Sequence, residues 1–300
     1  MDSISHLLQL AGLQATLDKR CLLSAATEMK VPAYGETDAT FHLLLDGECT
    51  LELPSGSYPL RAGEAVILPG SSPHFVRTQG VEPVRGVVDI PGPAFGTIRS
   101  QYDGEPVIDL FCGYYTPGSA AGAMLFRSLP DPLIVSVAAD EEAIRALCTM
   151  MRGEAGNPGP GAAAILTSLC EALLAMILRR SGLTATPLWT AVEDPRIADA
   201  IDAVLREPGA DWSVERLAQV ASMSRATFVR HFGKHTGTTV NGLVTRIRMM
   251  VAADLLGREG GEEHTVATVA AKVGYQSESA FSRAFQQATG STPGRFRRLP

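Results

Sequence analysis

The sequence predicts an α+β protein in which an N-terminal β-barrel and a helical pair precede an all-α domain with two helix-turn-helix motifs. Short alternating runs between glycines and prolines predict the barrel, apolar periodicity predicts the helical pair, and a repeated pattern near the C-terminus predicts the two motifs. With 300 residues, 45% of them apolar, the chain is long enough for two packed domains. We expect a first domain over residues 1–182, a linker over 183–194 and a second domain over 195–300.

In the N-terminal region the residue pattern changes from helical spacing to short alternating runs. Residues 1–17 carry apolar side chains at helical spacing, which predicts an amphipathic helix. From about residue 20 to residue 137 the chain alternates short runs with turn residues. The runs are Phe41–Leu45, Cys49–Leu53, Ala65–Leu68 and Gly86–Ile90. Strands about 8–12 residues apart are typical of a small antiparallel barrel or sandwich.

Two helices are predicted between the barrel and the linker. The first starts near Asp140, and the second, Ala162–Arg180, follows a loop rich in glycine and proline. The second helix is largely apolar but is interrupted by Thr167, Ser168 and Glu171, so we expect no membrane association. Such an apolar pair needs a partner surface. We expect it to pack on the barrel and on a second copy of the chain, giving a homodimer.

Two similar stretches lie near the C-terminus. Leu217–Ser224 leads into Phe228–Phe232, and Val269–Gln276 leads into Phe281–Phe285, at offsets of 52 and 53 residues. Each copy predicts a short apolar helix, a tight turn and a second helix, which is the pattern of a helix-turn-helix. The tandem copies therefore predict a protein that grips two successive stretches of the DNA major groove.

The spacing and charge of this region support DNA binding. We expect the motifs at about 213–236 and 265–289, joined by a helix at about 240–256 that spans roughly 26 Å. The two second helices could then lie about one DNA turn apart, roughly 34 Å. Residues 213–300 hold 12 Lys/Arg against 6 Asp/Glu, whereas residues 1–212 hold 14 against 26. A basic segment of this kind is the electrostatic footprint of a DNA-binding domain.

The second helix of each motif offers a defined set of groove-facing residues. Phenylalanines four residues apart, at 228 and 232 and at 281 and 285, should point into the core. The residues that we expect to contact DNA are Ser224, Arg225, Ala226, Thr227, Arg230, Gln276, Ser277, Glu278, Ser279, Ser282 and Arg283, with His231 on the same side. Arginine suits guanine, glutamine suits adenine and glutamate suits cytosine. Because the copies differ in these types, each chain should read an asymmetric site.

These motifs resemble a known family. Residues 195–300 are similar to the DNA-binding domain of the AraC/XylS family of bacterial transcription regulators, including the linking helix and the closing segment 291–297. The resemblance implies one recognition helix in each of two adjacent major grooves of promoter DNA. It further implies RNA polymerase as a partner and an activator of transcription. No signal peptide is visible at the start of the chain, so we expect a cytoplasmic protein.

The N-terminal half resembles the cupin-like sensor domain attached to many such regulators. Residues 63–69 followed by His74 are similar to the second cupin motif, but of the first motif's two histidines and glutamate only His42 is present. Since three ligands are the usual minimum for a catalytic metal centre, we expect no metal and no cofactor, and interpret His42 and His74 as packed or hydrogen-bonded residues. The resemblance thus implies a regulator that is not an enzyme, against the alternative of a metal-cupin enzyme tethered to DNA.

The five cysteines offer a candidate signal. They are odd in number and contain no C-x-x-C pair, which indicates neither a disulfide scaffold nor a zinc module. Cys21 follows Lys19 and Arg20, whose charges favour a thiolate. The surroundings of Cys21 and Cys112 resemble those in a subgroup of the family that senses reactive chlorine and other oxidants. We expect redox sensing at these two residues, with two alternatives open: both are silent core residues, or the barrel binds a small-molecule effector. The remaining cysteines, Cys49, Cys148 and Cys170, lie on apolar faces and are expected in the core.

Overall fold

The chain folds into two compact units that are each discontinuous in sequence. The computed structural model describes residues 3–35, 37–81, 84–92, 94–102, 104–118, 120–136, 142–180, 194–257 and 265–297. One unit, called the β unit below, comprises Gln14–Thr116 and Pro130–Arg180. The other, called the helical unit, comprises Met1–Leu13, Pro117–Leu129 and Ser181–Pro300. Of the linker expected at 183–194, all but Asp194 lies outside the described residues.

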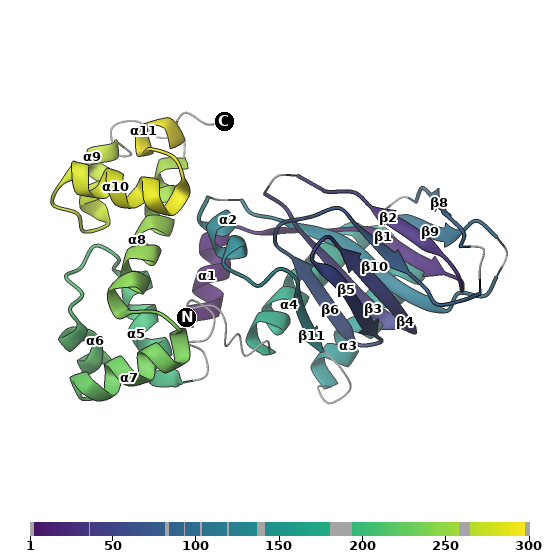
Figure 1. Cartoon of the computed structure of the whole chain (residues 1–300), viewed down its shortest axis with the longest axis horizontal. Helices are drawn as coiled ribbons and strands as arrows, with labels where there is room; N and C mark the ends of the chain where they lie inside the picture. The colour runs from purple at the N-terminus through teal and green to yellow at the C-terminus, as the bar shows by residue number, and fades with distance from the viewer. Residues whose placement is uncertain are drawn as a thin grey trace. The chain divides into compact units, whose positions relative to one another are not determined.

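The β unit contains the barrel-like part of the chain and confirms the α+β fold class. Its strands are β1 (Gln14–Leu23), β2 (Glu28–Val31), β3 (Ala39–Asp46), β4 (Glu48–Leu53), β5 (Gly56–Arg61), β6 (Glu64–Leu68), β7 (His74–Arg77), β8 (Val87–Ile90), β9 (Gly96–Ser100), β10 (Ile108–Thr116) and β11 (Leu133–Ser136). They form a seven-stranded sheet, in the order β11-β6-β3-β10-β1-β9-β8, and a four-stranded sheet, in the order β2-β7-β4-β5 (Figure 1). One apolar core is shared by residues of both sheets, among them Cys21, Leu51 and Cys112.

A β-bulge in the middle of β1 reverses which face of the sheet its alternate side chains point to. It pairs antiparallel with β10 along its length, but the register shifts between Leu17 and Lys19. Asp18 is the extra residue of this β-bulge. Beyond the bulge Cys21 points into the shared core, while Arg20 lies on the opposite face because successive side chains of a strand alternate. The bulge therefore sets which residues of β1 are buried beside β10.

Helices α3 (Glu142–Gly156) and α4 (Ala162–Arg180) complete the β unit. Helix α4 packs against β1 and α3, and the hydroxyl of Tyr115 donates a hydrogen bond to the carbonyl oxygen of Cys170 at 2.9 Å. Among the helices that the structure describes, α4 is the one whose length and composition would suit a membrane span. Both helices also expose apolar side chains, since Met150 is 57% exposed and Ile165 is 43% exposed.

The helical unit is built around one long helix. Its elements are α1 (Ser3–Ala11), α2 (Ala120–Arg127), α5 (Pro195–Arg206), α6 (Val214–Val220), α7 (Arg225–Thr236), α8 (Val240–Gly257), α9 (Val266–Lys272), α10 (Glu278–Thr289) and α11 (Pro293–Phe296). Figure 1 shows α6 and α7 near one end of α8, and α9 and α10 near the other. Helix α1 packs on α2 and α5, and α2 packs on α8. Two helices from the N-terminal half thus belong to the unit of the helix-turn-helix motifs, which differs from the continuous domain expected over 1–182.

The two motifs use the same local signals. Ser224 and Ser277 cap α7 and α10 by accepting a hydrogen bond from the backbone N–H three residues further on. Gly237 and Gly290 end the same two helices with φ values of 64° and 76°. This left-handed conformation favours glycine at a helix end. The sequence specifies both recognition helices locally, at their starts and at their ends.

Each recognition helix is anchored by a phenylalanine pair. Phe228 and Phe232 are buried with ring centroids 5.4 Å apart, and Phe281 and Phe285 are buried with centroids 5.5 Å apart. The second pair belongs to a cluster that also receives Met124 of α2. The spacing of four residues places both rings of a pair on one helix face, as the sequence predicts.

Truncating one of these rings should destabilise the helical unit. We expect Phe281→Ala to lower its free energy of unfolding by ~3–5 kcal/mol, because the change removes a buried ring and leaves a cavity. Urea unfolding of the full chain, followed by far-ultraviolet circular dichroism, measures the effect. The control is Val229→Ala, whose side chain is 45% exposed and whose loss should cost within about 0.5 kcal/mol. Equal transition midpoints for the two variants would contradict the anchor role.

Candidate DNA interface and sensor site

The first recognition helix presents a short polar surface at its start. Ser224, Arg225, Ala226 and Arg230 are exposed, and Thr227 is half-buried with its hydroxyl oxygen 2.9 Å from that of Ser224. Small residues at the start of α7 let its backbone approach the bases closely. The sequence predicts DNA contact for these residues, and that contact stays a prediction.

The second recognition helix presents a different set. Gln276, Ser277, Glu278, Ser279 and Arg283 are exposed, and Ser282 is half-buried. The hydroxyl groups of Ser277 and Ser279 lie 2.8 Å apart at the start of α10. Glu278 takes the place that Arg225 has in the first motif, and Gln276 takes the place of Met223, so the two helices would favour different bases.

The arginines of the two helices differ in what they contact. The Nε of Arg225 donates to the Oε1 of Glu215 on α6 at 2.5 Å, and both side chains are exposed. Within the described residues neither Arg230 nor Arg283 has an ion pair or hydrogen-bond partner. Their guanidinium groups are free to bind a base edge or a phosphate. To contact DNA, Arg225 would have to break its ion pair with Glu215.

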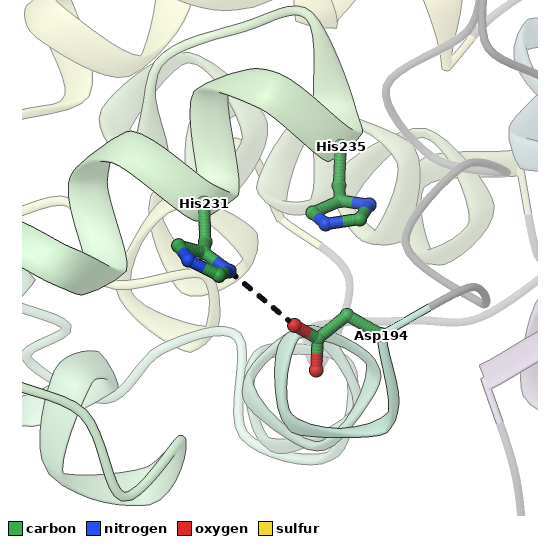
Figure 2. Close-up of side chains that lie close together, drawn as sticks. All are labelled: Asp194, His231 and His235. Carbon is green, nitrogen blue, oxygen red and sulfur yellow. Dashed lines mark ion pairs between the residues drawn. The ribbon is translucent and has the colours of Figure 1, made fainter.

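One residue expected at the groove faces elsewhere. Figure 2 shows His231 and His235, one helical turn apart on α7, turned toward Asp194 at the start of α5, with His231 Nδ1 3.6 Å from Asp194 Oδ2. The interpretation of His231 as groove-facing is therefore wrong, because α5 packs against that side of the first motif. Ligand atoms of the three side chains lie within 4.8 Å of one another, a spacing that would suit a metal ion. However, the Arg196 guanidinium takes both oxygens of Asp194, at 3.0 Å each.

Asp194 is a structural acid rather than a vacant ligand. Its side chain caps α5 by accepting a hydrogen bond from the backbone N–H of Arg196. The Arg196 guanidinium is the main cause that holds the pKa of Asp194 at about 2, and His231 adds to it. The carboxylate ties the start of α5 to the back of recognition helix α7.

In the β unit, four side chains from four strands meet in the core. The Sγ atoms of Cys21 and Cys112 lie 3.4 Å apart, and the Nδ1 of His42 lies 3.1 Å from Cys112 Sγ. The Nε2 of His42 lies 2.7 Å from the Nε2 of His74. All four residues are at most 2% exposed. The sequence predicts the two cysteines as a pair but does not reveal that both histidines join them.

The hydrogen-bond pattern fixes where each imidazole carries its proton. His74 Nδ1 lies 2.7 Å from the carbonyl oxygen of Ser72, which can only accept, so Nδ1 is protonated. Burial lowers the pKa of His74, and it lowers that of His42 further together with the neighbouring ring, so both are neutral. His74 Nε2 is then an acceptor and His42 Nε2 donates to it. The lone pair of His42 Nδ1 therefore points at Cys112.

The two cations next to Cys21 in sequence are both paired with carboxylates. The Nζ of Lys19 donates to Asp89 at 2.8 Å, and the guanidinium of Arg20 binds both oxygens of Asp109 at 2.9 and 3.0 Å on the opposite face of the strand. Burial is the main cause that raises the pKa of the Cys112 thiol. Each of the two cations is thus paired with a carboxylate, and the thiolate expected at Cys21 stays a prediction. The Cys112 thiol has one imidazole acceptor, the Nδ1 of His42.

Within the described part of the chain, no imidazole contact is recorded for the remaining cysteines. Cys49 and Cys170 are buried, and burial raises the pKa of each thiol to about 12. Cys148 on α3 is half-buried, and burial raises the pKa of its thiol as well. Their surroundings are those of small core residues.

Comparison with known proteins connects both parts of the chain to transcription regulators. Residues 2–181 match the family described as Cupin, and residues 217–299 match the family described as Helix-turn-helix domain. The chain is 30% identical to the RCS-specific HTH-type transcriptional activator RclR of Escherichia coli, over 99% of this chain and 97% of that protein. It is 29% identical to an uncharacterized HTH-type transcriptional regulator of Haemophilus influenzae, over 99% of both chains. It is 31% identical to a putative AraC-like transcription regulator of Streptomyces lividans, over 87% of this chain and 86% of that protein.

Substituting the free arginines should separate base reading from phosphate binding. We expect Arg230→Ala and Arg283→Ala each to weaken binding to the cognate site by ~1–3 kcal/mol if the side chain contacts a base. Fluorescence anisotropy with cognate and scrambled duplexes at one salt concentration measures the loss. Arg206→Ala is the control, since Arg206 pairs with Asp202 on α5. An equal loss on both duplexes would reassign the residue to phosphate contact, and no loss would remove it from the interface.

Proposed function

Because the chain belongs to the AraC/XylS-type transcription regulators that carry an N-terminal cupin domain, we propose that it activates transcription when the dithiol of Cys21 and Cys112 is oxidised. The observation that carries the proposal is the 3.4 Å separation of the two sulfurs, with His42 Nδ1 3.1 Å from Cys112 Sγ. The chain is a regulator with a DNA-binding helix-turn-helix domain. The direction of regulation and the signal are the proposed parts.

The proposed signal is an oxidant of the reactive-chlorine class. The name of the E. coli relative, an RCS-specific activator, supports this class. Hypochlorous acid transfers its chlorine to one thiol, giving a sulfenyl chloride and water. The second thiol displaces chloride as the S–S bond forms, and its proton leaves to His42 Nδ1 and then to solvent. In sum two thiols lose two electrons and two protons, and the oxidant becomes chloride and water. The small, uncharged oxidant suits a buried cysteine pair.

Bond formation would strain the pair of strands that holds the two cysteines. Cys21 is the register partner of Leu110, and Cys112 is the partner of Lys19, so the cysteines are diagonal neighbours. Diagonal neighbours have Cα atoms about 7–8 Å apart, whereas disulfides need about 4.4–6.8 Å. The sulfurs must also approach from 3.4 Å to about 2.05 Å. A disulfide therefore requires β1 and β10 to shift.

Both of these strands continue directly into the helical unit. β1 follows α1 across Gly12, and β10 leads into α2 across Gly118, whose N–H donates to the carbonyl oxygen of Gly12 at 3.1 Å. Helix α1 packs on α5, and α2 packs on α8, the helix that joins the two motifs. We infer that a shift of the strands reaches the DNA-binding helices through α1 and α2.

Three further features belong to the proposal. The protein works in the cytoplasm on promoter DNA and contacts RNA polymerase, as an activator must. It acts as a homodimer through α3 and α4, whose exposed apolar side chains Met150 and Ile165 support an interface there. No group other than the dithiol is assigned to the signal.

Removing either sulfur should abolish the response to oxidant. We expect Cys21→Ser and Cys112→Ser to lose the increase in reporter transcription after hypochlorous acid, because one sulfur cannot form the bond. DNA affinity of the reduced protein should stay unchanged, which shows that the variants fold. Cys148→Ser is the control and should respond as the original chain does. A full response in Cys21→Ser, or mass spectrometry that finds no Cys21–Cys112 disulfide after oxidation, contradicts the proposal.

The mass of the reduced protein in solution tests the dimer. We expect a mass near twice the 31.8 kDa of the chain by light scattering. The double variant Met150→Glu with Ile165→Glu should have the mass of one chain, because charge is costly at an apolar interface. A dimer that survives both changes would place the interface elsewhere.

A further inference from the structure

We propose that Arg248 is a positioning residue that fixes the second helix-turn-helix motif relative to the first, and so sets the spacing of the two DNA segments that the chain reads. Arg248 is half-buried on α8, the helix that joins the two motifs. This role concerns the DNA-binding helix-turn-helix domain and does not depend on the dithiol of the β unit. It assigns spacing selectivity, rather than base contact, to this residue.

The guanidinium group of Arg248 holds the loop that enters the first motif. This loop, residues 207–212, connects α5 to α6. The Nε of Arg248 donates to the carbonyl oxygen of Pro208 at 2.9 Å, and its Nη2 donates to that of Ala210, also at 2.9 Å. Because the guanidinium is planar and charged, two bonds from this one group fix both the position and the orientation of the loop.

The same loop meets the turn of the second motif. A Cβ on Gly209 would clash with the carbonyl oxygen of Lys272, at the end of α9. A Cβ on Gly274, in the turn after α9, would lie 2.7 Å from the carbonyl oxygen of Gly209 and 2.8 Å from Arg248 Nη2. The guanidinium group also lies beside Tyr275, with its Cζ 5.9 Å from the ring centroid. Arg248 is therefore packed between the loop of the first motif and the turn of the second.

The turn of the first motif shows that glycine is not required by the turn itself. Ser222 occupies the position equivalent to Gly274, and the N–H of each donates to the carbonyl oxygen three residues earlier. Both have the left-handed conformation, with φ of 52° at Ser222 and 80° at Gly274. The first turn thus accommodates a side chain, whereas the approach of Gly209 and Arg248 to the second turn excludes one. Gly274 is explained by the contact between the two motifs.

Both sides of this contact lead to a recognition helix. On the side of the second motif, the ring of Tyr275 packs edge-on against Phe281 of α10, with centroids 5.6 Å apart. On the side of the first motif, Arg216 of α6 donates to the carbonyl oxygen of Asp211 at 3.0 Å and stacks on Trp212, with its Cζ 4.2 Å from the ring centroid. Helix α6 in turn packs on α7. A second connection between α7 and α10 thus runs beside α8, and it passes through Arg248.

The orientation of the two motifs decides which spacing they can read, because the major groove turns around the DNA axis. One base pair inserted between two segments moves them apart by about 3.4 Å and rotates one against the other by about 34°. A chain whose motifs are fixed relative to each other binds both segments at one spacing. A chain whose second motif can turn binds them at several. The contact of Arg248 and Gly209 with the second turn therefore predicts selection of a single spacing.

Selection of duplexes from a randomised DNA library by the reduced full-length chain tests this role. Sequencing of the enriched pool gives the two common segments and the distance between them. We expect the original chain to enrich one spacing, and Arg248→Met to enrich two or more with the same sequence in each segment. Inserting one base pair into the most enriched duplex should weaken binding of the original chain about tenfold or more, because adapting to it breaks hydrogen bonds to a charged group. The loss for Arg248→Met should be smaller.

Two further variants separate the contact from the charge. Gly209→Ala adds a methyl group against the second turn and leaves the arginine in place, so it should also broaden the accepted spacings. Gly209 lies outside the positive-φ region, so alanine is not strained there. Arg246→Met is the matched control: it removes the same charge from α8 at an exposed residue that has no ion pair or hydrogen bond within the described part of the chain. The control should keep the single spacing.

Affinity for a duplex that carries one segment alone shows whether the variants fold, and each variant should bind it as the original chain does. A single spacing retained in both Arg248→Met and Gly209→Ala overturns the positioning role, as does an original chain that enriches one segment only. Loss of binding to the single-segment duplex in both variants would assign the contact to folding and equally overturns the role. The oxidant response is measured separately, so a failure here leaves the proposed signal in place, and a failure of the signal leaves this role in place.

Discussion

The pairing of β1 with β10 is the interaction on which the rest of the molecule depends. It joins the first strand of the β unit to a strand about ninety residues later and runs from Gln14 opposite Thr116 to Leu23 opposite Ile108. The two strands hold the cysteine pair, and their ends lead into α1 and α2. The approach is so close at Gly113 that a Cβ there would lie 2.2 Å from the carbonyl oxygen of Thr16. Any larger residue beside Cys112 would separate the strands.

The bulge at Asp18 determines which face of the β1–β10 pair the Cys21 side chain lies on. If Asp18 were paired in regular register, the alternation of β1 would place Cys21 opposite Asp109, on the other face from Cys112. Because Asp18 is bulged out, the Cys21 thiol enters the core, and Arg20 turns to Asp109 on the opposite side. The carboxylate–guanidinium pair is thus kept apart from the sulfurs, and His42 Nδ1 lies 3.1 Å from Cys112 Sγ. The environment of the dithiol is set by a register shift rather than by its sequence neighbours.

Features that depend on local sequence could be predicted here, whereas features that depend on strand register could not. The helix-turn-helix motifs are specified locally: Ser224 starts a helix, Gly237 ends it, and the same signals recur at Ser277 and Gly290. Those signals lie within a dozen or so residues and can be read directly. His42 is 70 residues from Cys112, and only strand register makes the two direct partners. A bulge of one residue leaves no clear mark in the pattern of apolar residues. The hydrogen bond between His42 and His74 and the pairing of Lys19 and Arg20 with carboxylates could therefore not be predicted.

The diagonal placement of the cysteines decides whether oxidation can act beyond its own site. A signal shifts a two-state regulator only by the difference in free energy that it makes between the states, and moving a population from 1:99 to 99:1 takes about 5.5 kcal/mol. Direct partners across an antiparallel pair have Cα atoms about 4.5–5.5 Å apart, within the range of a disulfide. Such a pair would close in place and leave the strands where they were. In the proposed oxidation the diagonal pair would have to bring its sulfurs from 3.4 Å to about 2.05 Å, so the energy of the bond would act on the strands that lead to α1 and α2.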